Sequence, residues 1–165
     1  MITIKEATAK DFKTIQEIAH KTWPDVYGEI LSAAQLDYML KAFYSVETLT
    51  DNMVNKGHHF ILAFEGDFCL GFASFQHDYL DKKVTRLHKI YLLPEAQGKG
   101  VGKLLVDAVA NYAKENDSTV ISLNVNRFNK ALTFYQKIGF EIVGEEDIEL
   151  EHGYLMEDYK MEKQL

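Results

Sequence analysis

One glycine-rich segment of this sequence is well suited to bind an anion. The segment Gln97–Lys103 holds three glycines and two lysines, and it directly follows an apolar stretch that ends at Pro94. Glycines let a ligand approach the backbone closely, and unpaired N–H groups at the start of a helix point toward negative charge. A helical pattern begins within this segment, so the sequence predicts a phosphate-binding loop that leads into a helix.

Two common phosphate-binding loops do not fit the spacing. A Walker A loop needs Ser or Thr after Gly-Lys, but Leu104 follows Gly102-Lys103, and Gln97 occupies the place of the earlier glycine. A dinucleotide-binding loop needs the spacing G-x-G-x-x-G, whereas these glycines stand at every second position from Gly98 to Gly102.

The segment closely resembles the signature Q/R-x-x-G-x-G/A of the GCN5-related N-acetyltransferase (GNAT) family, here Gln97-Gly98-Lys99-Gly100-Val101-Gly102. The strand end Ile90–Pro94 precedes it at the family's usual distance, and Phe134–Phe140 (FYQKIGF) resembles the family's F-Y-x-x-x-G-F element. The resemblance covers roughly residues 58–162, and the helical N-terminus is also similar to the family.

The resemblance implies that acetyl-CoA is the cosubstrate. Its pyrophosphate would bind the loop amides, and its pantetheine arm would lie along Ile90 to Leu92 like an added strand. A backbone N–H near Leu92 would polarise the thioester carbonyl. The implied cofactor-binding set is Ile90, Tyr91, Leu92, Gln97, Gly98, Lys99, Gly100, Val101, Gly102, Lys103, Asn129 and Tyr135.

Tyr135 and Asn129 carry expectations of their own. Tyr135 matches the tyrosine that protonates the departing CoA thiolate in many family members, and its alternative is a core tyrosine at a helix end. Asn129 resembles a CoA-contacting asparagine, although its distance from Tyr135 is one residue shorter than in many members. Asn126 is nearby, and either asparagine could instead cap a helix.

His88 is the predicted proton acceptor, because an amine must be neutral when it attacks and imidazole titrates near neutral pH. His88 precedes Leu92 by four residues on the predicted strand, where simple alternation places residues 88, 90 and 92 on one face. The alternatives are a histidine satisfied within the sheet and a mechanism that uses water as the base. The histidines and acids show no metal-ligand spacing, so no metal is predicted.

The acceptor is expected to bind near the N-terminal helices. Trp23, Tyr27 and Tyr38, with Asp25, could hold an amine through aromatic faces and charge, although packing is the alternative for each. The acidic run Glu145–Glu151 reads as a solvated strand edge. Leu87–Tyr91 (LHKIY) resembles the branch of bacterial spermidine/spermine acetyltransferases, which makes a polyamine the leading specific acceptor.

The surrounding elements follow from hydrophobic periodicity. Helices are expected after Thr8, after Ser32 and after Ser45, the first ending around Trp23–Gly28. Strands are expected over residues 60–64, 68–75, 84–93, 119–125, 140–150 and 154–162, with helices over 100–112 and 131–138. This order predicts an α/β (α+β) fold in three layers, in which helices flank a mixed, mostly antiparallel sheet.

Composition limits the function classes. The 165 residues fit one domain, residues 1–165, and a net charge of −7 argues against nucleic acid as a partner. No stretch suits a signal peptide or membrane span, so a cytoplasmic protein without a membrane partner is expected. The lone Cys69 lies within a strand pattern and reads as a buried thiol rather than a nucleophile. Exposed C-terminal strands are compatible with a homodimer.

The sequence therefore predicts an enzyme that transfers an acetyl group to a primary amine of a small molecule by direct attack in a ternary complex. Acetylation of a protein or peptide, and a non-catalytic acyl-CoA-binding regulatory module, are the alternatives.

Overall fold

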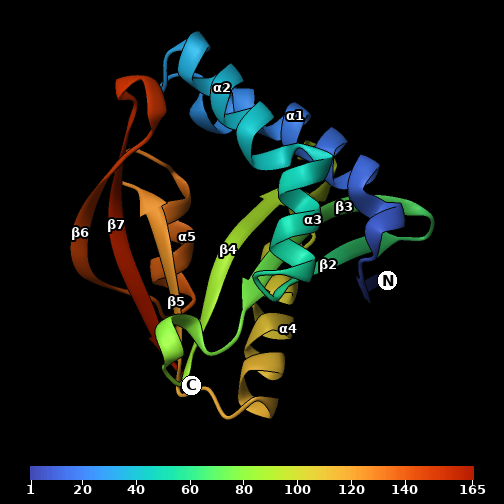
Figure 1. Cartoon of the computed structure of the whole chain (residues 1–165). Coiled ribbons are helices and arrows are strands. Elements are labelled where there is room, and N and C mark those ends of the chain that lie inside the picture. The colour runs from blue at the N-terminus through green and yellow to red at the C-terminus, as the bar shows by residue number, and fades with distance from the viewer.

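A computed structural model describes all 165 residues, and it contains a seven-stranded mixed sheet with helices on both faces (Figure 1). The strand order is β1-β2-β3-β4-β5-β7-β6, and only the β4–β5 pair is parallel. This arrangement confirms the predicted three-layer α/β fold with a mostly antiparallel sheet.

The strands are β1 (Ile2–Glu6), β2 (His58–Glu65), β3 (Phe68–Gln76), β4 (Val84–Leu92), β5 (Val120–Asn126), β6 (Glu141–Glu149) and β7 (Leu155–Gln164). The helices are α1 (Phe12–Tyr27), α2 (Ala33–Tyr44), α3 (Val46–Val54), α4 (Val101–Glu115) and α5 (Ala131–Lys137), with short 3₁₀ turns between elements. None of these helices is both long and apolar enough to cross a membrane.

The helix starts agree with the predicted caps. The Ser32 hydroxyl accepts the N–H of Gln35 at the start of α2, and Ser45 accepts the N–H of Thr48 at the start of α3. Side chains of this kind satisfy N–H groups that have no partner inside the helix. The Gln35 side chain does not complete a capping box, because it donates to the Leu155 carbonyl instead.

Helix α1 continues through Pro24 and ends within the range Trp23–Gly28 that the sequence predicted for its end. Trp23 and Tyr27 are both buried, and they lie four residues apart on the face of α1 that packs on the sheet. Their burial stabilises the last turn, although proline removes one backbone hydrogen bond from it. The helix ends at Gly28, whose N–H still donates to the Pro24 carbonyl.

Strand β1 was not predicted, although Ile2 and Ile4 alternate with polar residues. It pairs antiparallel with β2 over its whole length and forms one edge of the sheet. Both isoleucines pack against the buried cluster beneath α4.

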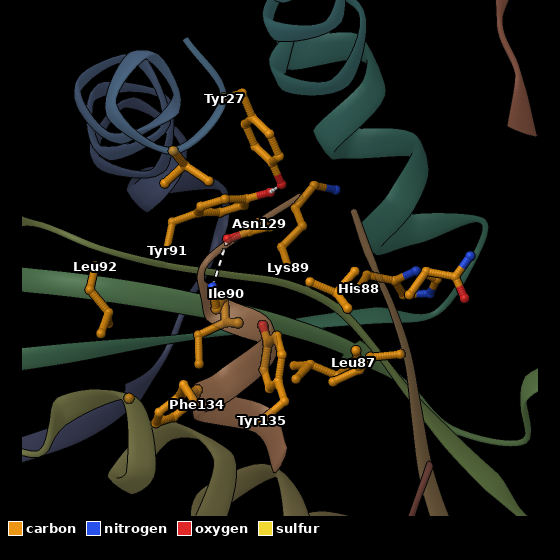
Figure 2. A pocket seen from close by; sticks show the side chains of 16 residues that line it. Tyr27, Leu87, His88, Lys89, Ile90, Tyr91, Leu92, Asn129, Phe134 and Tyr135 are labelled. Carbon is orange, nitrogen blue, oxygen red and sulfur yellow. Dashed lines mark hydrogen bonds between the residues drawn. The ribbon is translucent and has the colours of Figure 1, made fainter. Parts of the chain in front are cut away.

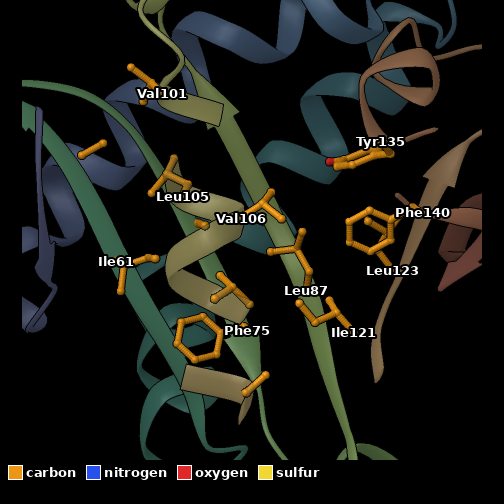
Figure 3. Close-up of a cluster of buried hydrophobic side chains, with 14 of the residues drawn as sticks. Ile61, Phe75, Leu87, Val101, Leu105, Val106, Ile121, Leu123, Tyr135 and Phe140 are labelled. Atoms are coloured by element: carbon orange, nitrogen blue, oxygen red, sulfur yellow. The ribbon is translucent and has the colours of Figure 1, made fainter. Parts of the chain in front are cut away.

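Two buried clusters hold the layers together. On one face, Leu105, Val106 and Val109 of α4 pack against the sheet, together with Tyr135 and Phe140 near α5 (Figure 3). On the other face, α1, α2 and α3 cover side chains such as Phe60 and Phe72. Each side chain of this size stabilises the fold by about 1.5–3 kcal/mol when fully buried. The two clusters clamp β4 between opposite helical layers.

A β-bulge in β4 changes the face of the sheet on which its side chains lie. Ser74 of β3 pairs with Lys89, and the next residue, Phe75, pairs with Leu87, so His88 has no partner across the ladder. A bulge inserts one residue and shifts the alternation by one position. Ile90 therefore faces the α4 layer, whereas His88 faces the layer of α1, α2 and α3. The predicted common face of residues 88, 90 and 92 is wrong for this reason.

The bulge stacks His88 on His58 of β2, with ring centroids 4.1 Å apart and planes 15° apart. The His88 Nε2 lies 2.9 Å from the Gln76 Oε1, which can only accept, so this nitrogen donates. Burial is the main cause that lowers the pKa of His58 to about 4 and that of His88 to about 2. The positive charges of Lys89 and Lys56 act in the same direction, and both imidazoles are neutral at pH 7.

We expect this histidine pair to make the fold less stable in mild acid. Below about pH 6.5 each imidazole binds a proton in the unfolded chain but not in the folded one, so stability present above pH 6.5 is lost as the pH falls toward 4. The expected loss between pH 7 and pH 5 is about 1 kcal/mol or more. Urea unfolding at several pH values measures it, and a His58→Gln/His88→Gln variant should show a shallower slope. Equal slopes for both proteins would contradict the assignment.

Candidate active site

The site is organised around the point where β4 and β5 separate. Their parallel pairing covers only three positions, from Val84 with Val120 to Arg86 with Ser122. Beyond Arg86, β4 pairs with β3 alone, and β5 pairs with β7 alone. The bulge at His88 bends β4 at this point, so the two strands diverge toward their C-terminal ends (Figure 1).

The backbone of β4 presents free N–H groups to the resulting gap. The Leu93 N–H donates to the Leu70 carbonyl on the β3 side. Because successive residues of a strand direct their N–H groups to opposite edges, those of Leu92 and Ile90 point toward β5. This is the edge at which an extended ligand can pair as an added strand.

A cavity of about 280 Å³ occupies this gap, and we call it the β4–β5 cavity. Figure 2 shows its lining: residues 87–92 of β4 on one side, and side chains from α5 and its preceding loop on the other. It brings together eight of the predicted site residues. These are Tyr27, His88, Ile90, Tyr91, Leu92, Gly102, Asn129 and Tyr135.

The predicted loop opens onto the same cavity through Gly102. A Cβ atom on Gly102 would lie 3.1 Å from Phe134 and 3.3 Å from Leu92, tighter than an ordinary contact. Gly98 and Gly100 adopt φ values of +77° and +69°, which suit glycine. Glycine is therefore required here by conformation at two positions and by close packing at the third.

The loop leaves its amides free for an anion. The N–H groups of Gly98, Gly100, Val101, Gly102 and Lys103 have no acceptor within the chain. They gather at the N-terminus of α4, where the helix dipole adds positive potential. The chain's own geometry therefore fits the pyrophosphate of a CoA molecule.

The charged and polar side chains of the loop lie at the surface. Lys99 forms an ion pair with Glu65 at 2.6 Å, and Lys103 forms one with Asp107 at 2.8 Å. The Gln97 side chain is exposed and has no hydrogen-bond partner within the protein, whereas its backbone N–H donates to the Pro94 carbonyl at 3.0 Å. Surface ion pairs of this kind contribute at most about 1 kcal/mol, so either lysine can exchange its carboxylate for a phosphate.

Tyr135 is held rigidly with its hydroxyl in the β4–β5 cavity (Figure 2). Its ring packs on Phe134 and Phe140, and the helix that carries it ends at Gly139, which has a φ of +103°. Burial is the main cause that raises the pKa of Tyr135, and the nearby Tyr27 adds to it. The phenol stays protonated at neutral pH and can donate its proton.

Asn129 and Asn126 both form turns in the loop before α5. The Asn129 Oδ1 accepts the Ala131 N–H at 2.9 Å, and the Asn126 Oδ1 accepts the Phe128 N–H at 3.0 Å. Asn129 lines the β4–β5 cavity, whereas Asn126 faces a second cavity. Each oxygen therefore closes a local turn, whereas the N-cap position of α5 is Lys130 and has no side-chain cap, and the Asn129 side chain remains at the cavity.

The second cavity has a volume of about 390 Å³ and lies between β4 and the layer of α1, α2 and α3; we call it the helix-side cavity. Trp23 and Tyr27 line it, as the sequence suggested. Tyr38 lies outside both cavities, where its hydroxyl donates to Glu151 and its ring contacts Tyr154. The remaining lining residues are Met39, Phe43, Tyr44, Thr48, Asn52, Lys56, Arg86, His88, Lys89, Tyr91, Asn124, Asn126, Ile148, Leu150, Met156 and Asp158.

The two cavities meet at β4. Tyr27, His88, Lys89, Tyr91 and Asn124 line both of them. The hydroxyls of Tyr27 and Tyr91 lie 2.8 Å apart, which ties α1 to β4 at this junction (Figure 2). A group bound in one cavity can therefore reach a group bound in the other.

Sequence reasoning missed all four charged residues of the helix-side cavity, which are Lys56, Arg86, Lys89 and Asp158. Lys89 is mostly buried and has no carboxylate within 4.0 Å, and burial lowers its pKa to about 8, with repulsion from Lys56 as the second cause. Asp158 of β7 is buried too, and burial raises its pKa against the opposing effect of a hydrogen bond from Asn124. Lys89 and Asp158 each lie in a strand that carries other charges as well, so their place in the cavity becomes visible only from their neighbours in space.

Comparison with known proteins agrees with this geometry. Residues 28–163 match the model of the acetyltransferase (GNAT) domain. A spermidine N(1)-acetyltransferase of Thermoplasma acidophilum is 27% identical over 146 residues, which cover 86% of this chain and 89% of that protein. A peptidyl-lysine N-acetyltransferase of Salmonella typhimurium, YjaB, is 24% identical over 68% of this chain and 71% of its own length.

Among solved structures, the PaiA N-acetyltransferase of Thermoplasma acidophilum in complex with coenzyme A superposes with a TM-score of 0.83 at 25% identity. The match covers 100% of this chain and 99% of that one. The free loop amides, the open edge of β4 and the family match lead to one conclusion: the chain belongs to the GNAT family of N-acetyltransferases, with acetyl-CoA as its cosubstrate.

Proposed function

We propose that this N-acetyltransferase acetylates the primary amine of a small molecule, and that the amine attacks acetyl-CoA directly within a ternary complex. The observation that carries the proposal is the meeting of two cavities at β4. The β4–β5 cavity suits the pantetheine arm, and the helix-side cavity, at about 390 Å³, has the size of a small-molecule site.

Acetyl-CoA supplies the activated acyl group. A C–N bond forms between the carbonyl carbon and the amine nitrogen, and the C–S bond breaks with its electron pair leaving on sulfur. The amine loses one proton, and the thiolate gains one. Free N–H groups of Leu92 and Ile90 face the gap and can polarise the carbonyl oxygen.

Tyr135 supports the proposal as the acid that protonates the thiolate. Its hydroxyl lies in the β4–β5 cavity, and burial keeps the phenol neutral until needed. A positioned acid of this kind contributes about 10²–10⁴-fold to the rate.

His88 remains a predicted base, but its surroundings favour the alternative that water accepts the amine proton. A histidine with a pKa of about 2 binds protons weakly at pH 7, and its Nε2 already donates to Gln76. His88 still lines both cavities, so it can order a water molecule at their junction.

The relatives act on acceptors of different classes, spermidine in one case and peptidyl-lysine in another. The spermidine relative supports a polyamine acceptor, as the sequence suggested. The helix-side cavity itself contains Lys56, Arg86 and Lys89, however, and these cations repel the additional ammonium groups of a polyamine.

We expect small primary amines to be acetylated more efficiently than lysine-containing peptides. Release of free CoA thiol, measured across a panel of diamines, arylalkylamines, amino acids and short peptides, gives kcat/KM for each. The best small amine should exceed the best peptide by about tenfold or more in kcat/KM, since a cavity of about 390 Å³ has the size for a small amine but for only part of a peptide. A peptide as the best substrate would instead support the protein-acetylating alternative.

Tyr135→Phe should lower kcat by about 10²-fold or more and leave the KM for acetyl-CoA within about threefold, because only the hydroxyl that donates the proton is removed and the ring remains. The same thiol-release assay measures both constants. Phe128→Leu changes an exposed aromatic outside both cavities and serves as the matched control. Full activity of Tyr135→Phe would exclude Tyr135 as the acid and leave it as a packing residue.

A further inference from the structure

The charge of the helix-side cavity is opposite to that of the whole chain. The protein carries a net charge of −7, yet this cavity is lined by three cationic side chains and one carboxylate. The cations are Lys56, Arg86 and Lys89, and the carboxylate is Asp158. An acidic protein that concentrates positive charge inside one cavity offers that cavity to an anionic group.

Of the three cations, Lys89 has the fewest nearby groups that offset its positive charge. Arg86 lies over the Tyr79 ring, and Lys56 has Asp51 at 3.6 Å. The Lys89 ammonium, in contrast, has only the faces of Tyr44 and Phe60 at 5.5 and 5.7 Å from the ring centroids. Figure 2 shows its side chain on the same side of β4 as Tyr27 and away from Tyr135.

Lys56 faces the same end of the cavity as Lys89, and repulsion between the two is one cause of the lowered pKa of Lys89. A buried cation that faces another cation is costly unless an anion lies between them. The Lys56 side chain is 60% exposed and has Asp51 at 3.6 Å, but no carboxylate of the chain lies within 4.0 Å of Lys89, so this end of the cavity fits a carboxylate of the bound acceptor.

Asp158 provides the opposite charge at another part of the wall. It is only 5% exposed, its Oδ2 accepts weakly from Asn124 at 3.4 Å, and its Oδ1 has no partner. A buried carboxylate oxygen without a partner requires a donor. Asn124 lines both cavities, so an amine held by Asp158 lies next to the β4–β5 cavity.

We infer that the acceptor is a small amine that also carries a carboxylate, such as an amino acid: its amine lies against Asp158, and its carboxylate lies between Lys89 and Lys56. This inference rests on the proposed function and specifies its substrate class. The reaction remains the transfer described above, with the C–N bond formed at the amine held near Asn124. A polyamine satisfies Asp158 but places a cation at the cationic end.

Matched pairs of amines test the inference, because the members of each pair differ only by the carboxylate. The pairs are lysine with cadaverine, ornithine with putrescine, and tyrosine with tyramine. In at least one pair, kcat/KM for the carboxylated amine should exceed that for its partner by about tenfold or more, as expected for a charge-assisted hydrogen bond. A preference for the decarboxylated member in every pair would overturn the inference.

Substitutions of single cavity residues test which side chains bind the carboxylate and the amine of the acceptor. Lys89→Met should lower kcat/KM of the carboxylated amine by about tenfold or more and reduce the preference within the pair, while Lys89→Arg should retain it. Asp158→Asn should lower kcat/KM for both members, because both carry the amine. Lys41→Met removes the same charge from the exposed face of α2, outside both cavities, and should change nothing. A preference unchanged in Lys89→Met would overturn the assignment of Lys89.

A binding measurement separates failure of this inference from failure of the proposed function. Trp23 is the single tryptophan and lines the helix-side cavity, so its fluorescence reports occupation without turnover. One outcome is saturable binding of a carboxylated amine to the CoA complex that is lost in Lys89→Met, together with no acetylation of that amine. This outcome would contradict the proposed function and support recognition of the carboxylate by Lys89. Acetylation of amines without any preference for a carboxylate would support the proposed function and overturn the inference that the cavity recognises a carboxylate.

Discussion

The early end of parallel pairing between β4 and β5 is the constraint on which the rest of this structure depends. After three paired positions the strands diverge, and β4 keeps a partner on one edge only. Backbone groups that face a gap must find partners there, so the open edge of β4 becomes a row of donors and acceptors for a ligand. A continuous sheet would satisfy these groups internally and leave no place for an extended cosubstrate.

The flanking layers turn this gap into a site. Helix α4 brings its unpaired amides to one end of the gap, and α5 brings a buried tyrosine to its wall. Helix α1 covers the other face and is tied to β4 by the hydroxyl pair of Tyr27 and Tyr91. Burial in two separate clusters holds these layers in place, so the groups at the junction are positioned by packing rather than by flexible loops.

Local patterns in the sequence predicted the parts of the molecule that local forces determine. The glycine spacing predicted the loop because its conformation depends on a few neighbouring residues, and periodicity located α4 and most strands. Tyr135 was found through its motif, and the structure places it in the β4–β5 cavity, although its catalytic role remains a prediction.

Other features depend on contacts between distant segments. The side of the sheet on which His88 lies follows from a bulge, and only the pairing of β4 with β3 reveals that bulge. Helix α1 continues past Pro24 because burial of its side chains on the sheet outweighs the lost backbone hydrogen bond. Lys89 and Asp158 do not stand out in the sequence, since each lies in a strand with other charged residues. Their role is suggested only by the folded structure, in which neither side chain has an oppositely charged group within 4.0 Å although both line the helix-side cavity.

The acidic strand β6 has a consequence for how copies of this chain can meet. Its outer edge is open, and Glu145, Glu146, Asp147 and Glu149 lie along it, with Arg127 reaching only Glu145 and Asp147. Two such edges brought together as one continuous sheet would set carboxylates opposite carboxylates, which is unfavourable for adjacent strands. The charges along this edge therefore disfavour direct pairing of two β6 strands into one continuous sheet.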